Sequence, residues 1–449
     1  MSSSSTSSDG GPTVAVKLFI DKAKRRVLFA ESDKEFVDVL FSFLTLPLGT
    51  IVRLFDKQSQ VGCLDELYKS VESLGECHFQ AKACKAMLLA PLNAAAAHCH
   101  RLQVKIGDSN PVYHCTNPFC SYTLFSSVPD AVCSCGNVVQ YMEEWTTQNP
   151  SVAVEDGVFG ISGSKFIITD DLQVSLASTR VMFSLMEQFG IPGNGNIEEK
   201  VVQLNSGKMT SLLRRALLTK QLLTGLFFNV AIEPNGAYLS ELPENLFAKQ
   251  AAEADPNFKA IKVRLVQAKD DSSVLYAEVG QDFVDLVFGL LSIPLGTIMK
   301  TFSQLPRNGC MDNLYKGVTG SVKQECQSIL LSPKAAPFYG CSNNVLQVEE
   351  LVRREGLVGC CYSYEMNPRS PTDTAVRTYI KGSPINFMVT NDLQIMPLSL
   401  TNTIQLLHAS NIPKNKLVEK ELTLNKTQVL KIIRAAFETR EALSSALLP

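Results

Sequence analysis

The sequence predicts an α+β protein, a tandem repeat of two related modules that each contain a β-hairpin, a buried apolar helix and a closing amphipathic helix. A long stretch occurs twice, as FVDVLFSFLTLPLGT at residues 36–50 and as FVDLVFGLLSIPLGT at residues 283–297. A second stretch recurs as FIITDDLQV at residues 166–174 and FMVTNDLQI at residues 387–395. The copies are 247 residues apart at the first stretch (36 to 283) and 221 apart at the second (166 to 387), so the second copy is shorter in between.

The limits of the copies divide the chain of 449 residues, which is longer than a usual single domain. A Ser-rich tail over residues 1–12 has the composition of a disordered segment. The first module covers residues 13–228 and the second covers residues 260–449. Residues 229–259 between them lose the hydrophobic periodicity and are interpreted as a linker.

Each module opens with a predicted β-hairpin. In the first, VAVKLFI at residues 14–20 and RVLFA at residues 26–30 are rich in strand formers, with a turn at residues 21–25. The turn is basic, which suits a nuclear address or a phosphate contact as well as a solvated tip. We favour the solvated tip, because the corresponding turn of the second module, QAKDDSS at residues 267–273, is not basic.

The repeated stretch predicts a helix that is buried on all sides. A membrane span is excluded on length, because Asp38 and Arg53 enclose 14 uncharged residues and a span needs about 20. The helix is expected to end near Leu46, with a tight turn at Pro47–Gly49, since proline interrupts helical hydrogen bonding. Thr50 is placed to cap a following helix. Anion binding by Leu-Gly-Thr is the weaker alternative, because the lysine and second glycine of a phosphate loop are absent.

An amphipathic helix is predicted next, over residues 63–74. Leu64, Leu67 and Val71 fall on one face at helical spacing. The cysteine at its start recurs as Cys310 in the second module, within the same apolar pattern. Buried thiols behave as small hydrophobic groups, so both cysteines are interpreted as packing residues.

The second recurring stretch predicts a strand, an Asp turn and a strand. The acids Asp170–Asp171 could serve acid–base chemistry, but the second copy has Asn391 at the first position. We therefore interpret them as turn residues. Each module is expected to close with a basic amphipathic helix, over residues 209–223 and 427–443.

A cysteine-bearing segment at residues 113–138 is the strongest chemical motif. Its spacing is C-x4-C, twelve residues, then C-x-C-G, with cysteines at Cys115, Cys120, Cys133 and Cys135. Two close pairs separated by a short loop are typical of a zinc ribbon, in which four thiolates close the coordination shell. The second pair is expected to face one side of an extended segment, and Gly136 to let the backbone turn under the metal. His114 is a spare ligand candidate.

Two alternatives remain for this motif: four unliganded cysteines in a loop, or an iron–sulfur cluster, which uses the same ligands. Zinc here would be structural, because four protein ligands leave no open position for water or substrate. The second module supports a structural role. Its Cys341, Cys360 and Cys361 cannot form two spaced pairs, so a catalytic metal would leave half of the molecule inactive.

Composition places the chain among soluble intracellular proteins. The net charge of −2 provides no field to attract nucleic acid or an anionic membrane, so neither partner is expected. The first residues contain no signal-peptide core, no transit-peptide arginines and no transmembrane segment. The cytoplasm or the nucleus is therefore expected, where cysteines are thiols or metal ligands rather than disulfides.

Several motifs in order resemble one family. The motifs that carry this resemblance are, in order, VKLFID, RVLFAE, the repeated apolar helix, GCLDELYKSV, the cysteine cluster and closing helices, here IEEKVVQL at residues 197–204. The chain resembles the plant family known as domain of unknown function 674. The resemblance covers nearly the whole chain and implies a plant protein with this tandem layout. It implies no catalytic residues, and the cysteine quartet matches in the first copy alone.

The sequence leads to two functional hypotheses. The first is a non-enzymatic protein-interaction or scaffold protein with a structural zinc site and a protein partner. The second is an enzyme with a site between the modules, where Asp38 and Asp285 would be buried acids with raised pKa values. We favour a simpler role for these two, as first-turn carboxylates that meet the helix dipole. Nucleic-acid binding by the ribbon is disfavoured, because Lys105 has few cationic neighbours and phosphate contacts need several.

Overall fold

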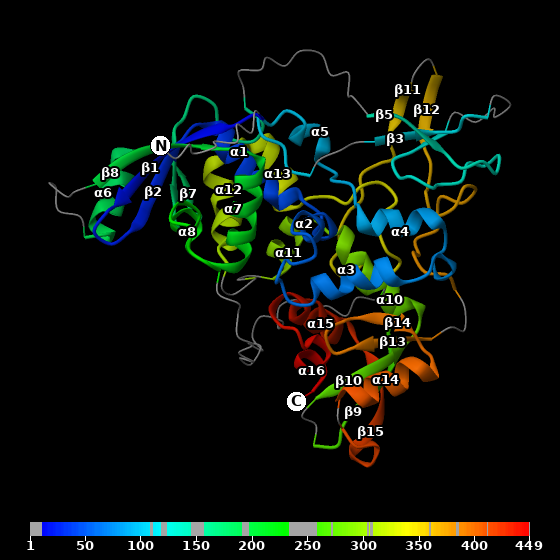
Figure 1. The fold of residues 1–449 in the computed structure, drawn as a ribbon. Helices are drawn as coiled ribbons and strands as arrows, with labels where there is room; N and C mark the ends of the chain where they lie inside the picture. Colours follow the sequence, from blue (N-terminus) through cyan, green and yellow to red (C-terminus); the bar gives the residue numbers. More distant parts are fainter. Residues whose placement is uncertain are drawn as a thin grey trace, which may run out of the picture.

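The chain forms a mixed α+β structure in which three five-stranded sheets surround a layer of helices (Figure 1). The computed structural model describes residues 11–107, 111–117, 124–144, 157–190, 197–232, 258–270, 273–302, 305, 309–358, 361–382, 386–410 and 412–448. Most of the tail 1–12 and of the linker 229–259 therefore lies outside the described residues. Within the described ranges, no helix is both long and apolar enough to cross a membrane.

The first sheet has the strand order β7-β6-β2-β1-β8. Its strands are β1 (Val14–Asp21), β2 (Arg26–Ser32), β6 (Phe166–Thr169), β7 (Val174–Leu176) and β8 (Ile197–Leu204). The predicted hairpin is confirmed, since β1 and β2 pair antiparallel. The expectation of a closing helix at residues 197–204 is wrong. This segment pairs with β1 over its full length and forms the edge strand β8, where adjacent valines favour extended backbone.

The second sheet has the matching order β14-β13-β10-β9-β15. Its strands are β9 (Ile261–Ala268), β10 (Val274–Val279), β13 (Phe387–Thr390), β14 (Ile395–Pro397) and β15 (Leu417–Leu424). The strand–turn–strand predictions at residues 166–174 and 387–395 are confirmed, because each stretch forms an antiparallel pair of strands.

The third sheet was not predicted from the sequence. Its order is β11-β12-β4-β3-β5, with β3 (Pro111–His114), β4 (Leu124–Ser126), β5 (Gln140–Glu144), β11 (Glu355–Val358) and β12 (Cys361–Glu365). Strands from both halves of the chain therefore build it. They meet where β12 runs parallel to β4, with Tyr364 opposite Leu124.

The first half contributes the helices α1 (Lys34–Ser42), η1 (Phe43–Thr45), α2 (Leu48–Leu54), α3 (Leu64–Ser73), η2 (Glu76–His78), α4 (Lys82–Leu89), α5 (Ala96–Cys99), α6 (Thr179–Gln188), α7 (Ser206–Leu218) and α8 (Leu222–Phe227). Most of them lie between the sheets, but α6 packs on the far face of the first sheet, and α14 (Leu400–Ser410) does the same on the second. The second half contributes α10 (Gln281–Gly289), η4 (Leu290–Ser292), α11 (Leu295–Thr301), α12 (Met311–Ser321), α13 (Gln324–Leu331), α14 (Leu400–Ser410), η5 (Lys414–Lys416), α15 (Lys426–Glu438) and α16 (Ala442–Leu447).

Each predicted closing helix is in fact two helices, α7 with α8 and α15 with α16. The break falls at Thr219 and at Thr439, which both have extended backbone. Each threonine hydroxyl accepts a hydrogen bond from the N–H two residues later, which favours a turn over continued helix.

The repeated apolar stretch is buried as predicted, and its two copies touch each other. The Leu48 N–H donates to the Ile293 carbonyl (3.0 Å), and the Leu295 N–H donates to the Leu46 carbonyl (2.9 Å). The predicted cap at Thr50 is wrong, because α2 already begins at Leu48. The Thr50 hydroxyl donates to the Pro91 carbonyl instead (3.2 Å).

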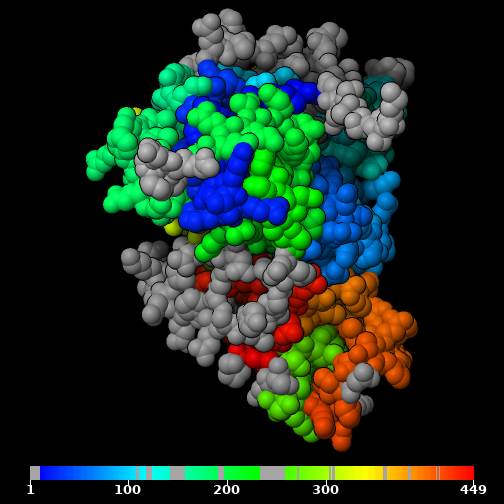
Figure 2. Space-filling model, turned by 60° about the vertical axis from the view of Figure 1, so that its left-hand side comes forward, coloured from blue at the N-terminus to red at the C-terminus, as the bar shows by residue number. Residues whose placement is uncertain are grey.

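The two halves exchange helices, in the sense that α3 of the first half packs on the second sheet and α12 of the second half packs on the first sheet. The start of α3 is bound to the end of α15, where the Cys63 N–H donates to the Ala436 carbonyl (2.8 Å). The Cys310 N–H does the same to the Ala216 carbonyl of α7 (2.8 Å), so each recurring cysteine meets the other half. Figure 2 shows the blue surface near α3 and α4 adjoining the orange surface near β13 and β14. The packing role predicted for both thiols is confirmed by their burial.

One hydrophobic cluster includes buried residues of both halves. On the second sheet, the Ile395 N–H of β14 donates to the Ser70 hydroxyl of α3 (2.8 Å). On the first sheet, the Ser321 hydroxyl of α12 donates to the Val174 carbonyl of β7 (3.2 Å). Each of the first two sheets is therefore covered in part by a helix from the other half of the chain.

Candidate metal centre

Three of the four predicted cysteine ligands come together beside the third sheet. The sulfur atoms of Cys115, Cys133 and Cys135 lie within 4.8 Å of one another, and those of Cys115 and Cys135 are 3.5 Å apart. Thiolates bound to one tetrahedral zinc ion would be about 3.8 Å apart, given a Zn–S distance of about 2.3 Å. Cys120 lies outside the described residues. The three sulfurs fit the spacing of a thiolate metal site and could hold a metal ion.

The second cysteine pair sits in a tight turn. The Gly136 N–H donates to the Cys133 carbonyl (2.8 Å), and the Cys133 N–H donates to the Asn137 carbonyl (2.8 Å). Gly136 has a φ of +89°, which confirms its predicted role in turning the backbone. The expectation that Cys133 and Cys135 share one side of an extended strand is wrong, because it is the turn that brings their sulfurs together.

The spare ligand candidate, His114, is not part of this group. It is the last residue of β3 and directly precedes Cys115, and neighbouring side chains of extended backbone point to opposite sides. Its Nδ1 lies 3.1 Å from the Cys115 carbonyl oxygen. The histidine therefore borders the cysteine group without joining it.

The first candidate acid, Asp38, is the fifth residue of α1 and is buried. Its Oδ2 accepts a hydrogen bond from the Val158 N–H (2.7 Å), and its Oδ1 accepts from the N–H groups of Phe159 (2.7 Å) and Gly160 (2.6 Å). Burial raises the pKa of this carboxyl, and the three hydrogen bonds oppose that rise. The carboxylate holds the loop that leads to β6.

The second candidate acid, Asp285, is the fifth residue of α10 and is also buried. Its Oδ1 accepts hydrogen bonds from the N–H groups of Tyr379 (2.8 Å) and Ile380 (2.9 Å), and its Oδ2 accepts from Gln281 Nε2 (3.2 Å). Burial raises the pKa of Asp285 to about 6. The first-turn interpretation of both acids is wrong, because each lies beyond the first turn and binds a distant loop.

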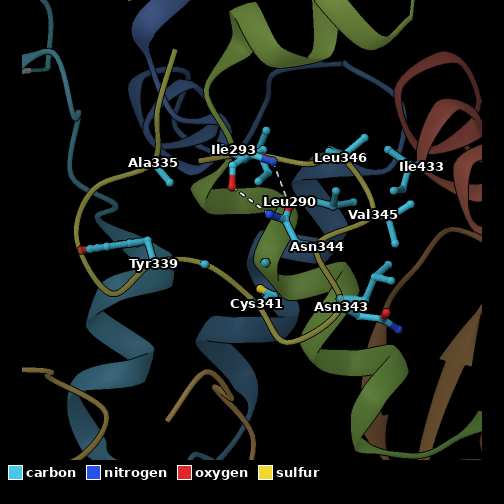
Figure 3. A pocket seen from close by; sticks show the side chains of 14 residues that line it. Leu290, Ile293, Ala335, Tyr339, Cys341, Asn343, Asn344, Val345, Leu346 and Ile433 are labelled. Atoms are coloured by element: carbon cyan, nitrogen blue, oxygen red, sulfur yellow. Dashed lines mark hydrogen bonds between the residues drawn. The ribbon is translucent and has the colours of Figure 1, made fainter. Parts of the chain in front are cut away.

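A small apolar cavity of about 30 Å³ lies between α10 and the loop after α13 (Figure 3). Tyr339, Cys341 and Ile433 contribute to its walls, and Asp38 and Asp285 do not. A volume of this size accommodates a few water molecules at most, since one water needs roughly 10–15 Å³ measured in this way. The cavity therefore gives the enzyme hypothesis no substrate site.

The third sheet presents tyrosines on one face, a feature that the sequence analysis missed; Tyr113 on this face packs in part against the main hydrophobic cluster. The ring centroids of Tyr113 and Tyr141 are 5.7 Å apart, and those of Tyr362 and Tyr364 are 5.5 Å apart. Tyr141 is 59% exposed and Tyr362 is 50% exposed, whereas Phe125 on the opposite face is buried. The alternation in YSYE at residues 362–365 is a strand pattern that could have revealed half of this face.

Comparison with known proteins identifies the family. The family model described as "Protein of unknown function (DUF674)" matches residues 10–427 and, in a second match, residues 373–449. No curated protein and no solved structure matches the chain. The matched residues span nearly the whole sequence, in agreement with the order of motifs noted above. The chain therefore belongs to the DUF674 family.

Proposed function

We propose that this chain is a non-enzymatic protein-interaction or scaffold protein of plants, in which a zinc-held sheet presents a tyrosine face to a protein partner. The observation that carries the proposal is the face of the third sheet defined by Tyr113, Tyr141, Tyr362 and Tyr364, called here the tyrosine face. Tyr141 and Tyr362 are its exposed part, and Tyr113 and Tyr364 are half-buried. Exposed aromatic side chains on a rigid sheet are typical of binding surfaces, because tyrosine gives a large contact area at small entropic cost.

Zinc is the metal that best suits the cysteine site. Cys115, Cys120, Cys133 and Cys135 would supply four thiolates, which zinc binds in a closed tetrahedral shell. Cys115 follows β3, and the Cys133–Gly136 turn lies between β4 and β5. The ion would thus hold together the strands on which β12 of the second half is paired, and its role is structural.

The modules proposed for this chain are residues 13–228, with a zinc-ribbon-like segment at 113–138, and residues 260–449, joined by a linker at 229–259. Two observations support a tandem repeat. The first two sheets have matching strand orders. Asp38 and Asp285, which are equivalent in the repeated stretch, bind backbone N–H groups of equivalent loops 221 residues apart, at 158–159 and 379–380.

A protein is the partner that the tyrosine face favours over nucleic acid or membrane. Arg353 stacks on Tyr364 and Glu355 lies opposite Tyr364 in the register, so both charge signs border the face. Backbone binding of nucleic acid needs several uncompensated cations. We propose a location in the cytoplasm or the nucleus, because a reducing compartment keeps the thiols available as ligands.

The proposal is tested by comparing two double variants as affinity baits. Tyr141→Ser with Tyr362→Ser removes the most exposed rings of the tyrosine face. Phe183→Ser with Ile404→Ser is the matched control, because both side chains are exposed on helices outside the third sheet. A protein retained by the wild type and the control, and lost from the tyrosine variant by at least about tenfold, is expected for a hot-spot surface. Equal retention of every protein by all three baits would contradict the proposal.

A further inference from the structure

We propose that a surface cleft in the second half of the chain binds a small organic carboxylate. The cleft has a volume of about 430 Å³, which lies in the range of small-molecule sites. It opens between the loop after α13, the segment that leads into β11 and the loop at residues 374–377. This inference does not depend on the zinc site, and the cleft adjoins the tyrosine face, because Arg353 stacks on Tyr364.

The cleft contains a guanidinium group that no carboxylate of the described residues neutralises. Arg377 binds Glu350 at 2.6 Å, so the charges of this pair compensate. Arg353 has no carboxylate within 4.0 Å in the part of the chain that the structure describes, and its guanidinium stacks 5.0 Å from the ring centroid of Tyr364. Stacking holds the arginine in place and leaves its N–H groups available to an anion.

A second positive charge contacts the loop that carries Pro337 and Phe338, outside the lining of the cleft. The Arg369 side chain is buried, its Nη1 donates to the Gly340 carbonyl (2.9 Å), and its Nε and Nη2 have no hydrogen-bond partner among the described residues. The neighbouring carboxyl of Asp285 makes no hydrogen bond with it and binds backbone N–H groups instead. A buried guanidinium without a bound carboxylate makes the potential nearby more positive, because protein screens charge less than water does.

One side of the cleft is apolar and held in an unusual conformation, whereas Glu350, Arg353, Thr374 and Arg377 make the rest of the lining polar. Phe338 has a φ of +67°, which is rare for a bulky side chain and costs on the order of 1–3 kcal/mol. Such residues concentrate at ligand clamps. Pro337 and Leu351, which is 38% exposed, extend the apolar surface beside it. The loop is fixed by Gly340, whose N–H donates to Glu350 and where an added Cβ would lie 2.5 Å from the Glu350 Oε1.

These features select one ligand class. Among the residues that line the cleft, Arg353 carries the one guanidinium without a carboxylate partner, which matches one negative charge, and its planar fork matches a carboxylate. A phosphate dianion would need a second cation, and Arg377 is already bound to Glu350. The apolar wall would contact the body of the ligand, and the Thr374 hydroxyl at the rim could donate to its free oxygen. The cleft thus fits an apolar monocarboxylate.

The test is a calorimetric titration of the full chain with benzoate, benzamide and inorganic phosphate. Benzoate is expected to bind at millimolar concentration or tighter, and neutral benzamide at least about tenfold more weakly, as for loss of a charged hydrogen bond. Arg353→Gln should weaken benzoate binding by a similar factor. The matched control is Arg264→Gln, because Arg264 is an exposed arginine on the second sheet that pairs with Glu278 and Glu421. It should bind benzoate like the wild type.

A second variant tests the apolar wall. Leu351→Ser should weaken benzoate at least about threefold, the effect of losing part of a hydrophobic contact, and leave the melting temperature unchanged. Four results would overturn the proposal: no benzoate binding below about 10 mM, equal binding of benzamide and benzoate, tighter binding of phosphate than of benzoate, or an Arg353→Gln variant that binds like the wild type.

Discussion

Asp38 and Asp285 occupy equivalent positions but use their oxygens differently. Asp38 receives backbone N–H groups on both oxygens, from Val158 on one and from Phe159 and Gly160 on the other. Asp285 receives both of its backbone N–H groups on Oδ1, while Oδ2 faces a side-chain amide. An amide in place of the carboxylate keeps one acceptor oxygen and turns the other into a donor. The two sites should therefore respond differently to the same substitution.

We expect Asp38→Asn to lower the free energy of unfolding by about 1–3 kcal/mol, because one buried backbone N–H would then face another donor. Asp285→Asn should cost less than about 1 kcal/mol near pH 5, since its oxygen can still accept both backbone N–H groups and the native carboxyl is already mostly protonated at that pH. Denaturant unfolding of both variants measures the difference. Equal destabilisation by the two substitutions would contradict these hydrogen-bond assignments.

The pH dependence follows from the raised pKa of Asp285. The native pKa of about 6 exceeds the usual 3.8, so the native state binds the proton more tightly than the unfolded chain does. This contribution to stability is full below pH 3.8 and is lost as the pH rises through 6. Relative to the wild type, Asp285→Asn should gain about 2 kcal/mol between pH 4 and pH 7. A pH-independent difference between the two proteins would refute this linkage.

Sequence reasoning located individual residues where the chemistry is local. The spacing of Cys115, Cys133 and Cys135 predicted their meeting, and the glycine after the second pair predicted the turn. Thr50 was assigned the wrong partner, because the start of α2 depends on a contact with the second half, at Ile293. The uncompensated charge of Arg353 could not be predicted either, since it depends on which carboxylates the fold brings near.

At the scale of elements, hydrophobic patterns predicted the hairpins, the apolar helices and the strand–turn–strand stretches. They did not reveal the edge strand β8, which the family resemblance had assigned to a closing helix. Most residues of β8 are exposed or half-buried, so its sequence shows no clear alternation of apolar and polar residues. They also failed for the third sheet. Its strands are short, and residues 124 and 364, which pair in parallel, are 240 positions apart. Single-sequence patterns contain no information about such pairing.

The third sheet is the element that a bound metal ion should stabilise. We expect one zinc ion per chain by elemental analysis, and a lower melting temperature after chelation, because structural zinc contributes roughly 10–16 kcal/mol of apparent binding energy in small sites. Cys135→Ser should lose the metal and reproduce the effect of the chelator. Cys77→Ser is the matched control, since Cys77 is exposed and outside the cluster.

Two results would contradict this expectation. Protein free of metal that melts like the untreated sample would remove the structural zinc site. Iron in place of zinc would favour the cluster interpretation, and electron transfer would then be the first property to examine.

At the scale of the whole molecule, the exchange of α3 and α12 determines how the halves hold together. Gly62 is part of this exchange: its φ is +48°, and an added Cβ would overlap the Ala436 carbonyl of α15. The recurring Gly-Cys pair therefore marks the close approach of one half to a helix of the other. The recurring stretches led us to propose a repeat, but matching motifs do not reveal which half each helix contacts.

We expect the two halves to remain associated after the chain is cut at a protease site inserted within residues 233–257. The reason is that each of the first two sheets is covered in part by a helix of the other half, within one hydrophobic cluster. Gel filtration should show both fragments in one peak until denaturant is added. Gly62→Ala should promote separation, whereas Gly163→Ala, at a φ of +73° with open space around it, should not. Fragments that separate in native buffer would refute the exchange.

A protein with one copy of the repeat could form the same contacts only as a dimer. In that dimer, the helix equivalent to α3 of each molecule would pack on the sheet of the other molecule. The covalent connection between the copies replaces that encounter, because it sets a fixed effective concentration for the second copy. Melting of the intact chain should then be independent of dilution, as for a monomer. A change on the exchanged face of α3 must also be matched on β14, about 325 residues away, so the two halves are constrained to vary together.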